Sequence, residues 1–127
     1  MRKQNRPALP TLCLFVIIAL CASVFIPRPT DAHSPGALTL KYDAETRILY
    51  VTVSHGVSNP SKHYIEKVTI TKNGAYYKAV EYTRQPDESP FTYEYIVDAT
   101  TGDELKVKAE CSYFGSKTRK IDVGKEQ

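Results

Sequence analysis

Two histidines and one cysteine are the residues of this chain that could do chemistry together. His55 and His63 stand on either side of a seven-residue loop that contains Pro60, so the loop can bring both rings to the same rim of a sheet fold. Cys111 stands at the end of a later run in which apolar and polar residues alternate. Two imidazoles and a thiolate suit a first-row transition metal. The spacing leaves a plainer interpretation open, with solvent-facing loop histidines and a core cysteine.

Other standard sites are missing from the sequence. It contains no glycine-rich phosphate loop, no CxxC pair and no serine in a nucleophile elbow. Four glutamates in the alternating runs fit the solvated face of a sheet: Glu66, Glu81, Glu94 and Glu110. The nine tyrosines are typical of packing residues in strands.

The first 32 residues have the pattern of a secretory signal peptide. Basic residues at positions 2, 3 and 6 precede an uncharged run from Leu12 to Ile26, and Thr30-Asp31-Ala32 places small residues around a cleavage point. The run is short for a membrane span, which needs about 20 apolar residues. We therefore predict a periplasmic or secreted protein of residues 33–127 without a membrane span in its mature form. An uncleaved membrane anchor is the alternative.

Removal of this leader changes the charge and the cysteine content. Residues 33–127 contain 13 basic and 13 acidic side chains, so their net charge is zero. A nucleic-acid partner is excluded, because it would require clustered Lys and Arg on the folded part. Cys13 and Cys21 leave with the leader, so Cys111 has no partner for a disulfide within the chain. Cys111 is then a buried small hydrophobe, a link between chains or a metal thiolate.

Short alternating runs separated by turn residues predict an all-β fold. The Asn73-Gly74 pair predicts a hairpin turn, since both residues accept positive φ. Seven strands at this spacing are typical of an immunoglobulin-like β-sandwich that forms one domain. The expected strands are residues 37–42, 48–54, 64–72, 76–83, 91–97, 105–113 and 117–123.

Two motifs resemble those of the desulfoferrodoxin/superoxide reductase family. Lys62-His63-Tyr64-Ile65-Glu66 is similar to the segment around one of the family's ligand histidines. Cys111-Ser112-Tyr113-Phe114-Gly115 is similar to the family's Cys-Asn-x-His-Gly motif at the end of a strand. The resemblance implies an immunoglobulin-like sandwich that holds one mononuclear non-haem iron with four histidines and an axial cysteine. Such a site reduces superoxide to peroxide, and the thiolate donates electron density to the iron.

The resemblance carries over to individual residues only in part. His63 and Cys111 match ligand positions, and His55 matches the histidine of the family's His-Pro pair, with Gly56 in place of proline and a loop two residues longer. Phe114 stands where the family has a ligand histidine. The family's Glu-Lys-His segment is missing, and with it an assisting lysine. His33 is the candidate for the remaining ligand; as a first mature residue it would resemble a copper-binding histidine brace. If the site forms, Cys111 Sγ is expected close to a ring nitrogen of His63.

The sequence thus predicts an exported, superoxide reductase-like iron-binding protein with an incomplete site made by His55, His63, Cys111 and His33. Its partners would be superoxide and an electron donor, and copper is an alternative metal. The competing hypothesis is a non-catalytic periplasmic binding module that kept the scaffold and lost the metal. Whether the chain is an enzyme is left open by the sequence.

Overall fold

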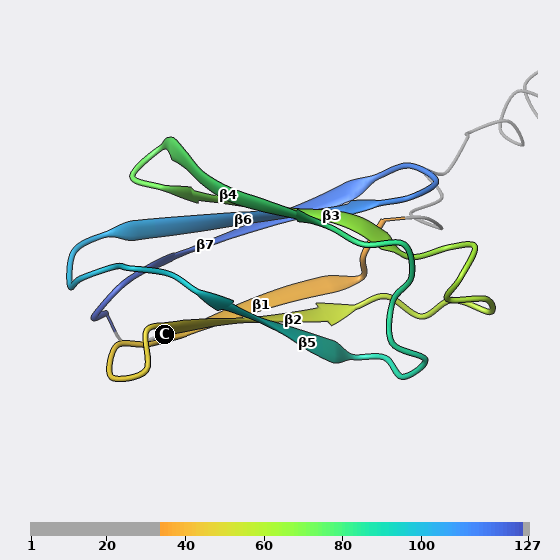
Figure 1. The fold of residues 1–127 in the computed structure, drawn as a ribbon, viewed down its shortest axis with the longest axis horizontal. Helices are drawn as coiled ribbons and strands as arrows, with labels where there is room; N and C mark the ends of the chain where they lie inside the picture. The colour runs from red at the N-terminus through yellow and green to blue at the C-terminus, as the bar shows by residue number, and fades with distance from the viewer. Residues whose placement is uncertain (1–33, 126–127) are drawn as a thin grey trace, which may run out of the picture. The chain divides into compact units, whose positions relative to one another are not determined.

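A computed structural model describes residues 34–125, all within one compact unit of the chain, Asp31–Gln127. This described part contains strands and no helix (Figure 1). The expected leader and His33 lie outside it. The strands are β1 (Ala37–Asp43), β2 (Ile48–Ser54), β3 (Ile65–Lys72), β4 (Ala75–Glu81), β5 (Phe91–Ile96), β6 (Glu104–Cys111) and β7 (Ser116–Asp122).

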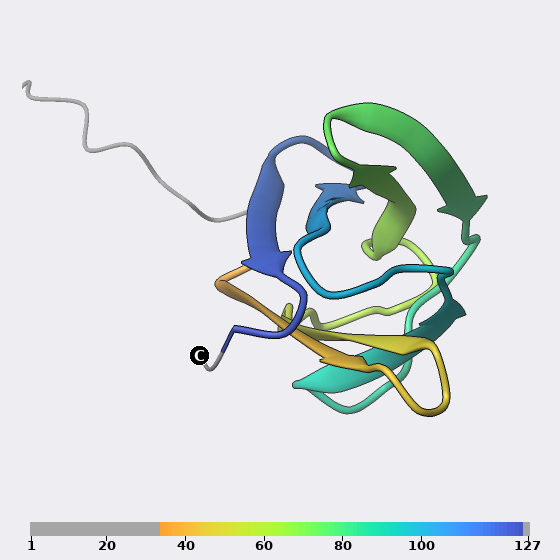
Figure 2. The same cartoon turned by 90° about the vertical axis from the view of Figure 1, so that its left-hand side faces the viewer.

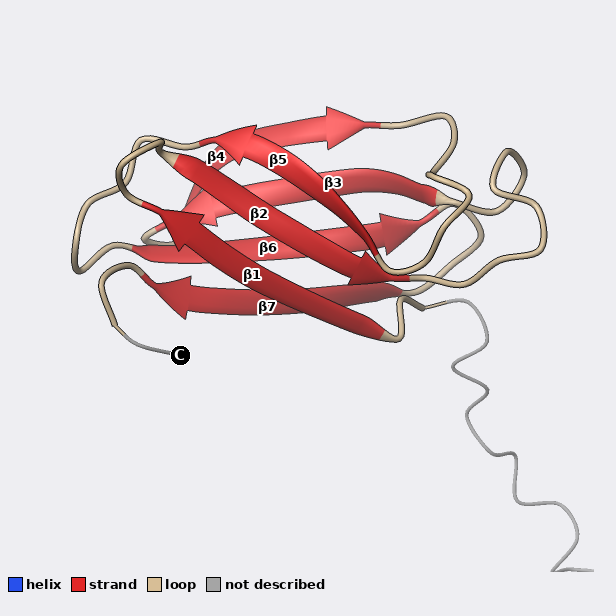
Figure 3. Ribbon diagram, turned by 90° about the horizontal axis from the view of Figure 1, so that it is seen from below, coloured by secondary structure: helices blue, strands red, loops and turns tan. Residues whose placement is uncertain are grey.

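The strands form two antiparallel sheets that face each other (Figures 1 and 3). One sheet has three strands in the order β1-β2-β5, and the other has four in the order β4-β3-β6-β7. The end view in Figure 2 shows β1 and β7 side by side, where the two layers approach each other. The prediction of an all-β fold with seven strands is confirmed, and each strand lies within two residues of its expected bounds.

The core between the sheets follows from the alternation in the sequence. In a strand, every second side chain points to the same face, and in β2 these are Leu49, Val51 and Val53, all fully buried. Val68 and Ile70 of β3 face them from the other sheet and are also buried. Burial of one such side chain contributes about 1.5–3 kcal/mol to folding, so the inward-facing residues hold the two layers together.

Three tyrosines fill one side of the space between the layers. Tyr82 stacks on Tyr93 with ring centroids 4.3 Å apart, and its hydroxyl lies 2.7 Å from the hydroxyl of Tyr95. Burial raises the pKa of Tyr93 and of Tyr95 above the ordinary value. These phenols therefore stay neutral and act as packing groups, as the sequence predicts.

The seven strands define two ends of the fold, because every strand is antiparallel to its neighbours. We call one the turn end; it holds the short connections 44–47, 73–74 and 97–103. At this end Asn73 and Gly74 both have positive φ, 51° and 79°, which confirms the predicted hairpin turn. The other is the site end, with the connections 55–64, 82–90 and 112–115. All three residues of the predicted metal site that lie in the described part are at the site end.

One expectation for this end is wrong. The alternation predicts that the strand ending in the cysteine motif continues to Tyr113 and that this side chain points inward. The strand instead ends at Cys111, and Tyr113 is more than half exposed. The reason is a tight connection: Cys111 N–H donates to the carbonyl of Gly115, whose φ is +94°. The chain therefore turns back immediately into β7.

The part of the chain that the structure describes contains no helix long and apolar enough to span a membrane.

Candidate metal centre

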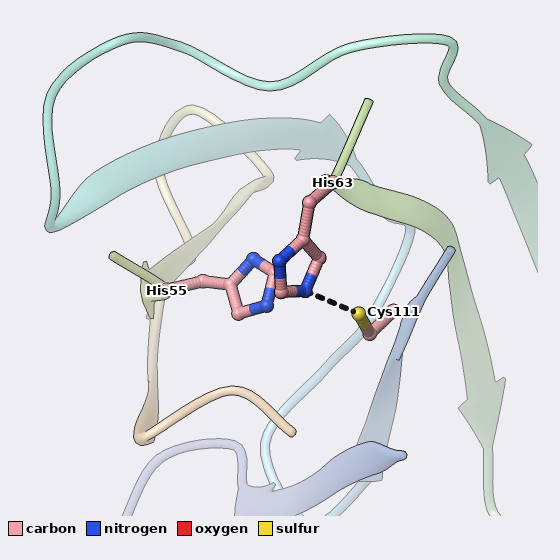
Figure 4. Close-up of side chains that lie close together, drawn as sticks. All are labelled: His55, His63 and Cys111. Carbon is pink, nitrogen blue, oxygen red and sulfur yellow. Dashed lines mark hydrogen bonds between the residues drawn. The ribbon is translucent and has the colours of Figure 1, made fainter. Parts of the chain in front are cut away.

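Two of the predicted ligands meet where β3 begins and β6 ends. These strands are neighbours in one sheet, and Ile65 of β3 pairs with Cys111 of β6. His63 stands two residues before β3, and its Nε2 lies 3.0 Å from Cys111 Sγ (Figure 4). Ser112 N–H donates to the carbonyl of Tyr64, which fixes the backbone between the two side chains. The expected contact between the cysteine sulfur and the His63 ring is confirmed.

His55 reaches the same place from the other sheet. It follows the last residue of β2, and its ring lies edge-on to the ring of His63, with centroids 4.8 Å apart (Figure 4). One ligand atom from each of His55, His63 and Cys111 can be chosen so that all three lie within 4.8 Å of one another. Three segments of the chain thus bring two imidazoles and a thiol together, and this group could hold a metal ion.

The cluster is largely shielded from solvent. The side chains of His55 and Cys111 are 4 % and 3 % exposed, and His63 is half-buried. The ring of Tyr113 stacks on His63 at 4.6 Å with an angle of 13° between the planes. Sequence reasoning assigned Tyr113 to a core position and missed this role. Low exposure strengthens interactions between charges and dipoles, since less water screens them.

A second residue that the sequence did not reveal is Gln85. It lies in the connection between β4 and β5 and is 2 % exposed. Its Oε1 lies 2.7 Å from His55 Nδ1, and its Nε2 donates to the carbonyl of His55 at 2.7 Å. The residue stands in a polar loop 30 positions from the histidine. No motif or alternation marks it, so no sequence signal could have found it.

The remaining predicted positions contribute no donor within the described residues. Phe114, which stands where the resemblance places a ligand histidine, is 67 % exposed and offers no ligand atom. His33 lies outside the described residues. Its neighbour Ser34 does lie at the site end, because a Cβ built on Gly115 would contact the side chain and Cα of Ser34. The described donor set is therefore His55, His63 and Cys111.

Cys111 is a free, buried cysteine in the structure. Its low exposure, 3 %, disfavours a link between chains, because the sulfur of another chain would have to reach it. Its contact with His63 favours a metal thiolate over a purely apolar residue.

The sequence matches no family model, no curated protein and no solved structure.

Proposed function

We propose that this protein binds one transition-metal ion through His55, His63 and Cys111. The observation that carries the proposal is the convergence of these three donors, from β2, β3 and β6, within 4.8 Å. Loop histidines and a core cysteine without a common task have no reason to meet at one point. His55, from the three-stranded sheet, instead lies against His63 and close to Cys111, which both come from the four-stranded sheet (Figure 4).

The chemistry of the donors fits a borderline or soft metal. Imidazole suits iron, copper, zinc and nickel, and a thiolate adds preference for copper, zinc and iron over magnesium and calcium. A metal also accounts for an unpaired cysteine in an exported protein, where free thiols are unusual. We infer iron as the resident metal, with copper as the alternative that a terminal His33 would favour.

The finer proposal is a superoxide reductase-like protein. The sheet orders β1-β2-β5 and β4-β3-β6-β7 support an immunoglobulin-like sandwich, in which seven antiparallel strands are divided between two facing sheets. The motif residues His63 and Cys111 also lie in contact, as the resemblance implies. Iron(II) at this site would supply the single electron that, with two protons, converts superoxide to hydrogen peroxide. An external electron donor is then needed as a partner.

The residues of this chain set a limit on that activity. Cys111 offers a thiolate that can donate electron density to the iron, and burial keeps the thiolate away from bulk water. Phe114 offers no donor, so the described cluster has fewer imidazoles than the complete site of the family. We therefore expect weak metal binding and slow superoxide reduction. His33 is proposed as a further donor, supported by the position of Ser34 against the turn that follows Cys111.

The proposal includes export. Residues 1–32 would direct the chain out of the cytoplasm and be removed, leaving a periplasmic or secreted protein that begins at His33. A mass measured on exported material tests this directly. An intact N-terminus on membrane-bound protein would support an uncleaved anchor instead.

The second candidate is a binding module without metal or catalysis. One observation favours it: Tyr113 and Phe114 are exposed aromatic residues next to the cluster, and aromatic side chains are enriched where proteins contact partners. In that case the contact between His63 and Cys111 would be a structural hydrogen bond.

Metal loading followed by superoxide decay separates the two candidates. The purified protein and its Cys111→Ser variant would be titrated anaerobically with Fe(II), Cu(I) and Zn(II), with bound metal measured by elemental analysis. The proposal expects one ion per chain for the unchanged protein and a much weaker site in the variant. Superoxide generated by a pulse should then decay at a rate proportional to the amount of bound iron. The absence of uptake of all three metals would favour the binding module.

A further inference from the structure

Gln85 makes hydrogen bonds to three points of the connection that carries both histidines. Besides the two bonds of Gln85 to His55, its Oε1 accepts from the N–H of Ile65 at 3.2 Å. The backbone N–H of Gln85 donates to the carbonyl of Pro60 at 3.2 Å. His55 follows β2, Pro60 is in the middle of the connection and Ile65 begins β3. One buried side chain from another loop thus holds together both ends of the segment from His55 to Ile65.

The backbone partners determine which way the Gln85 amide is turned. The carbonyl of His55 can only accept a hydrogen bond, so the atom that faces it must be the amide nitrogen. The N–H of Ile65 can only donate, so the atom that faces it must be the amide oxygen. Both requirements agree. In the reverse orientation a donor would face the N–H of Ile65 and an acceptor would face the carbonyl of His55 inside the protein. Such unsatisfied buried groups destabilise a fold, because each has lost its hydrogen bonds to water.

The orientation of the amide then determines the tautomer of His55. The oxygen Oε1 has no hydrogen to donate, so His55 Nδ1, 2.7 Å away, must carry the proton of their shared hydrogen bond. In a neutral imidazole the other nitrogen, Nε2, then has the lone pair. A metal binds an imidazole through a nitrogen with a lone pair.

We infer that Gln85 is a positioning residue of the metal site: it holds His55 as the Nδ1–H tautomer and makes Nε2 the donor atom of that ring. The inference concerning metal rests on the function proposed above, whereas the assignment of the tautomer rests on the hydrogen bonds alone. Histidines that bind metals usually donate their second ring N–H to an oxygen acceptor, which sets the ring orientation and raises the basicity of the donor. In this chain the acceptor is an amide from a loop 30 residues away.

The tautomer can be read by NMR on metal-free protein labelled with ¹⁵N-histidine, in mildly alkaline buffer where imidazole is neutral. Signals are assigned with His33→Gln and His63→Gln variants, since the chain has three histidines. The inference expects the His55 proton on Nδ1. In Gln85→Met the acceptor is lost, and the Nε2–H form should become populated. In Gln85→Glu a carboxylate oxygen replaces Oε1, and the Nδ1–H form should be retained. A proton on Nε2 of His55 in the unchanged protein, or in Gln85→Glu, would overturn the inference.

Co(II) binding supplies the second measurement. Removing a hydrogen-bond partner of a ligand histidine typically weakens metal binding about 10–100-fold. This loss is expected for Gln85→Met, and Gln85→Glu, which keeps the acceptor for His55 Nδ1 but loses the donor to the His55 carbonyl, should retain more of the affinity. Tyr42→Phe is the matched control, because it removes part-buried hydrogen bonds to Val97 and Ala99 at the turn end. Its Co(II) affinity should not change. Equal affinity of Gln85→Met and the unchanged protein would contradict the positioning role.

The two measurements distinguish a failure of the metal proposal from a failure of the role assigned to Gln85. If the unchanged protein takes up no Co(II) but His55 carries its proton on Nδ1, the metal proposal fails and the assignment of Gln85 stands. If Co(II) binds and His55 carries its proton on Nε2, the metal proposal stands and the role of Gln85 is wrong. Should Gln85→Met fail to fold, Gln85→Glu still decides the tautomer.

Discussion

The connections at the turn end and those at the site end differ in how deeply their hydrogen-bonding side chains are buried. At the turn end, Asp43 accepts from the N–H groups of Glu45 and Thr46, and Asp103 accepts from the N–H of Thr100, all within three residues and exposed. At the site end, the partners of His55 and Cys111 are 30 and 48 residues away, and the groups are buried. At the turn end even the hydrogen bond from Asn73 to Asp103, which spans 30 residues, is exposed. Buried bonds between distant residues bring selected side chains to one point, which is what a binding site requires.

The carboxylates of Asp43 and Asp103 at the turn end are exposed groups held by hydrogen bonds. Hydrogen bonds from the backbone of Thr46 and Glu45 hold the pKa of Asp43 below its ordinary value. A hydrogen bond from Asn73, together with the N–H of Thr100, lowers the pKa of Asp103. These carboxylates favour the folded state in their charged form. Their task is structural, and none of them lies at the metal cluster.

The largest expected effect is the loss of the thiolate. Cys111→Ser removes a ligand but keeps the size of the side chain, so we expect metal affinity to fall by about 100-fold or more, beyond the range for partners of ligands. The free energy of unfolding of the metal-free protein should change far less. Cobalt titration followed by elemental analysis of the bound metal measures the first, because the variant has no thiolate-to-metal absorption, and urea denaturation measures the second. A site that retains full affinity without Cys111 would break the contrast between the two ends.

A matched pair of glycines sharpens the contrast in packing. Gly115 at the site end and Gly102 at the turn end have almost the same φ, +94° and +96°. An alanine is strained at both, by roughly 1–2 kcal/mol. At Gly115 the added Cβ would also meet Ser34, whereas at Gly102 nothing lies within 4 Å.

We therefore expect Gly115→Ala to lower stability more than Gly102→Ala, and to weaken metal binding because Gly115 accepts from Cys111 N–H. Urea denaturation of both variants and a Co(II) titration measure the differences. Equal losses of stability in the two variants would show that Ser34 does not pack on the turn in solution.

A smaller effect concerns acid stability. The pKa of Asp103 is lower in the folded state, so the stability that it contributes is present above its unfolded pKa of about 3.9 and is lost as pH falls through the folded value. Asp103→Asn should therefore lower the melting temperature near neutral pH and should flatten its decline below about pH 4. Thermal unfolding followed by circular dichroism from acid to neutral pH measures this. Metal affinity at neutral pH should stay unchanged, and a clear change there would contradict the independence of the two ends.

The smallest expected effect is a gain in metal affinity. Phe114→His places an imidazole where the resemblance has a ligand, but the side chain at this position is largely exposed, so ordering it costs conformational entropy. We expect iron retention to improve by roughly tenfold at most, equal to about 1.4 kcal/mol. Competition with a chelator measures it, with Phe114→Gln as the control without a metal-binding ring. An unchanged affinity would mean that the turn after Cys111 points position 114 away from the cluster.

The sequence alone determined the seven strands, because alternation and turn residues are local signals and the sheet pattern repeats them in every strand. It also predicted the meeting of His63 and Cys111, through motif positions. It placed Cys111 at the end of its strand but carried the alternation on to Tyr113, because the tight turn to Gly115 depends on a hydrogen bond and not on alternation.

Only the tertiary structure could bring Gln85 to His55 and stack Tyr113 on His63. A glutamine in a polar loop carries no functional signal in the sequence. Gln85 is buried against His55 only because the two sheets pack against each other and the loop is covered. Its partners are backbone groups of distant residues, which leave no pattern in the sequence. The physical reason is general: periodic burial is encoded in neighbouring residues, whereas the pairing of buried polar groups depends on which segments the fold brings together.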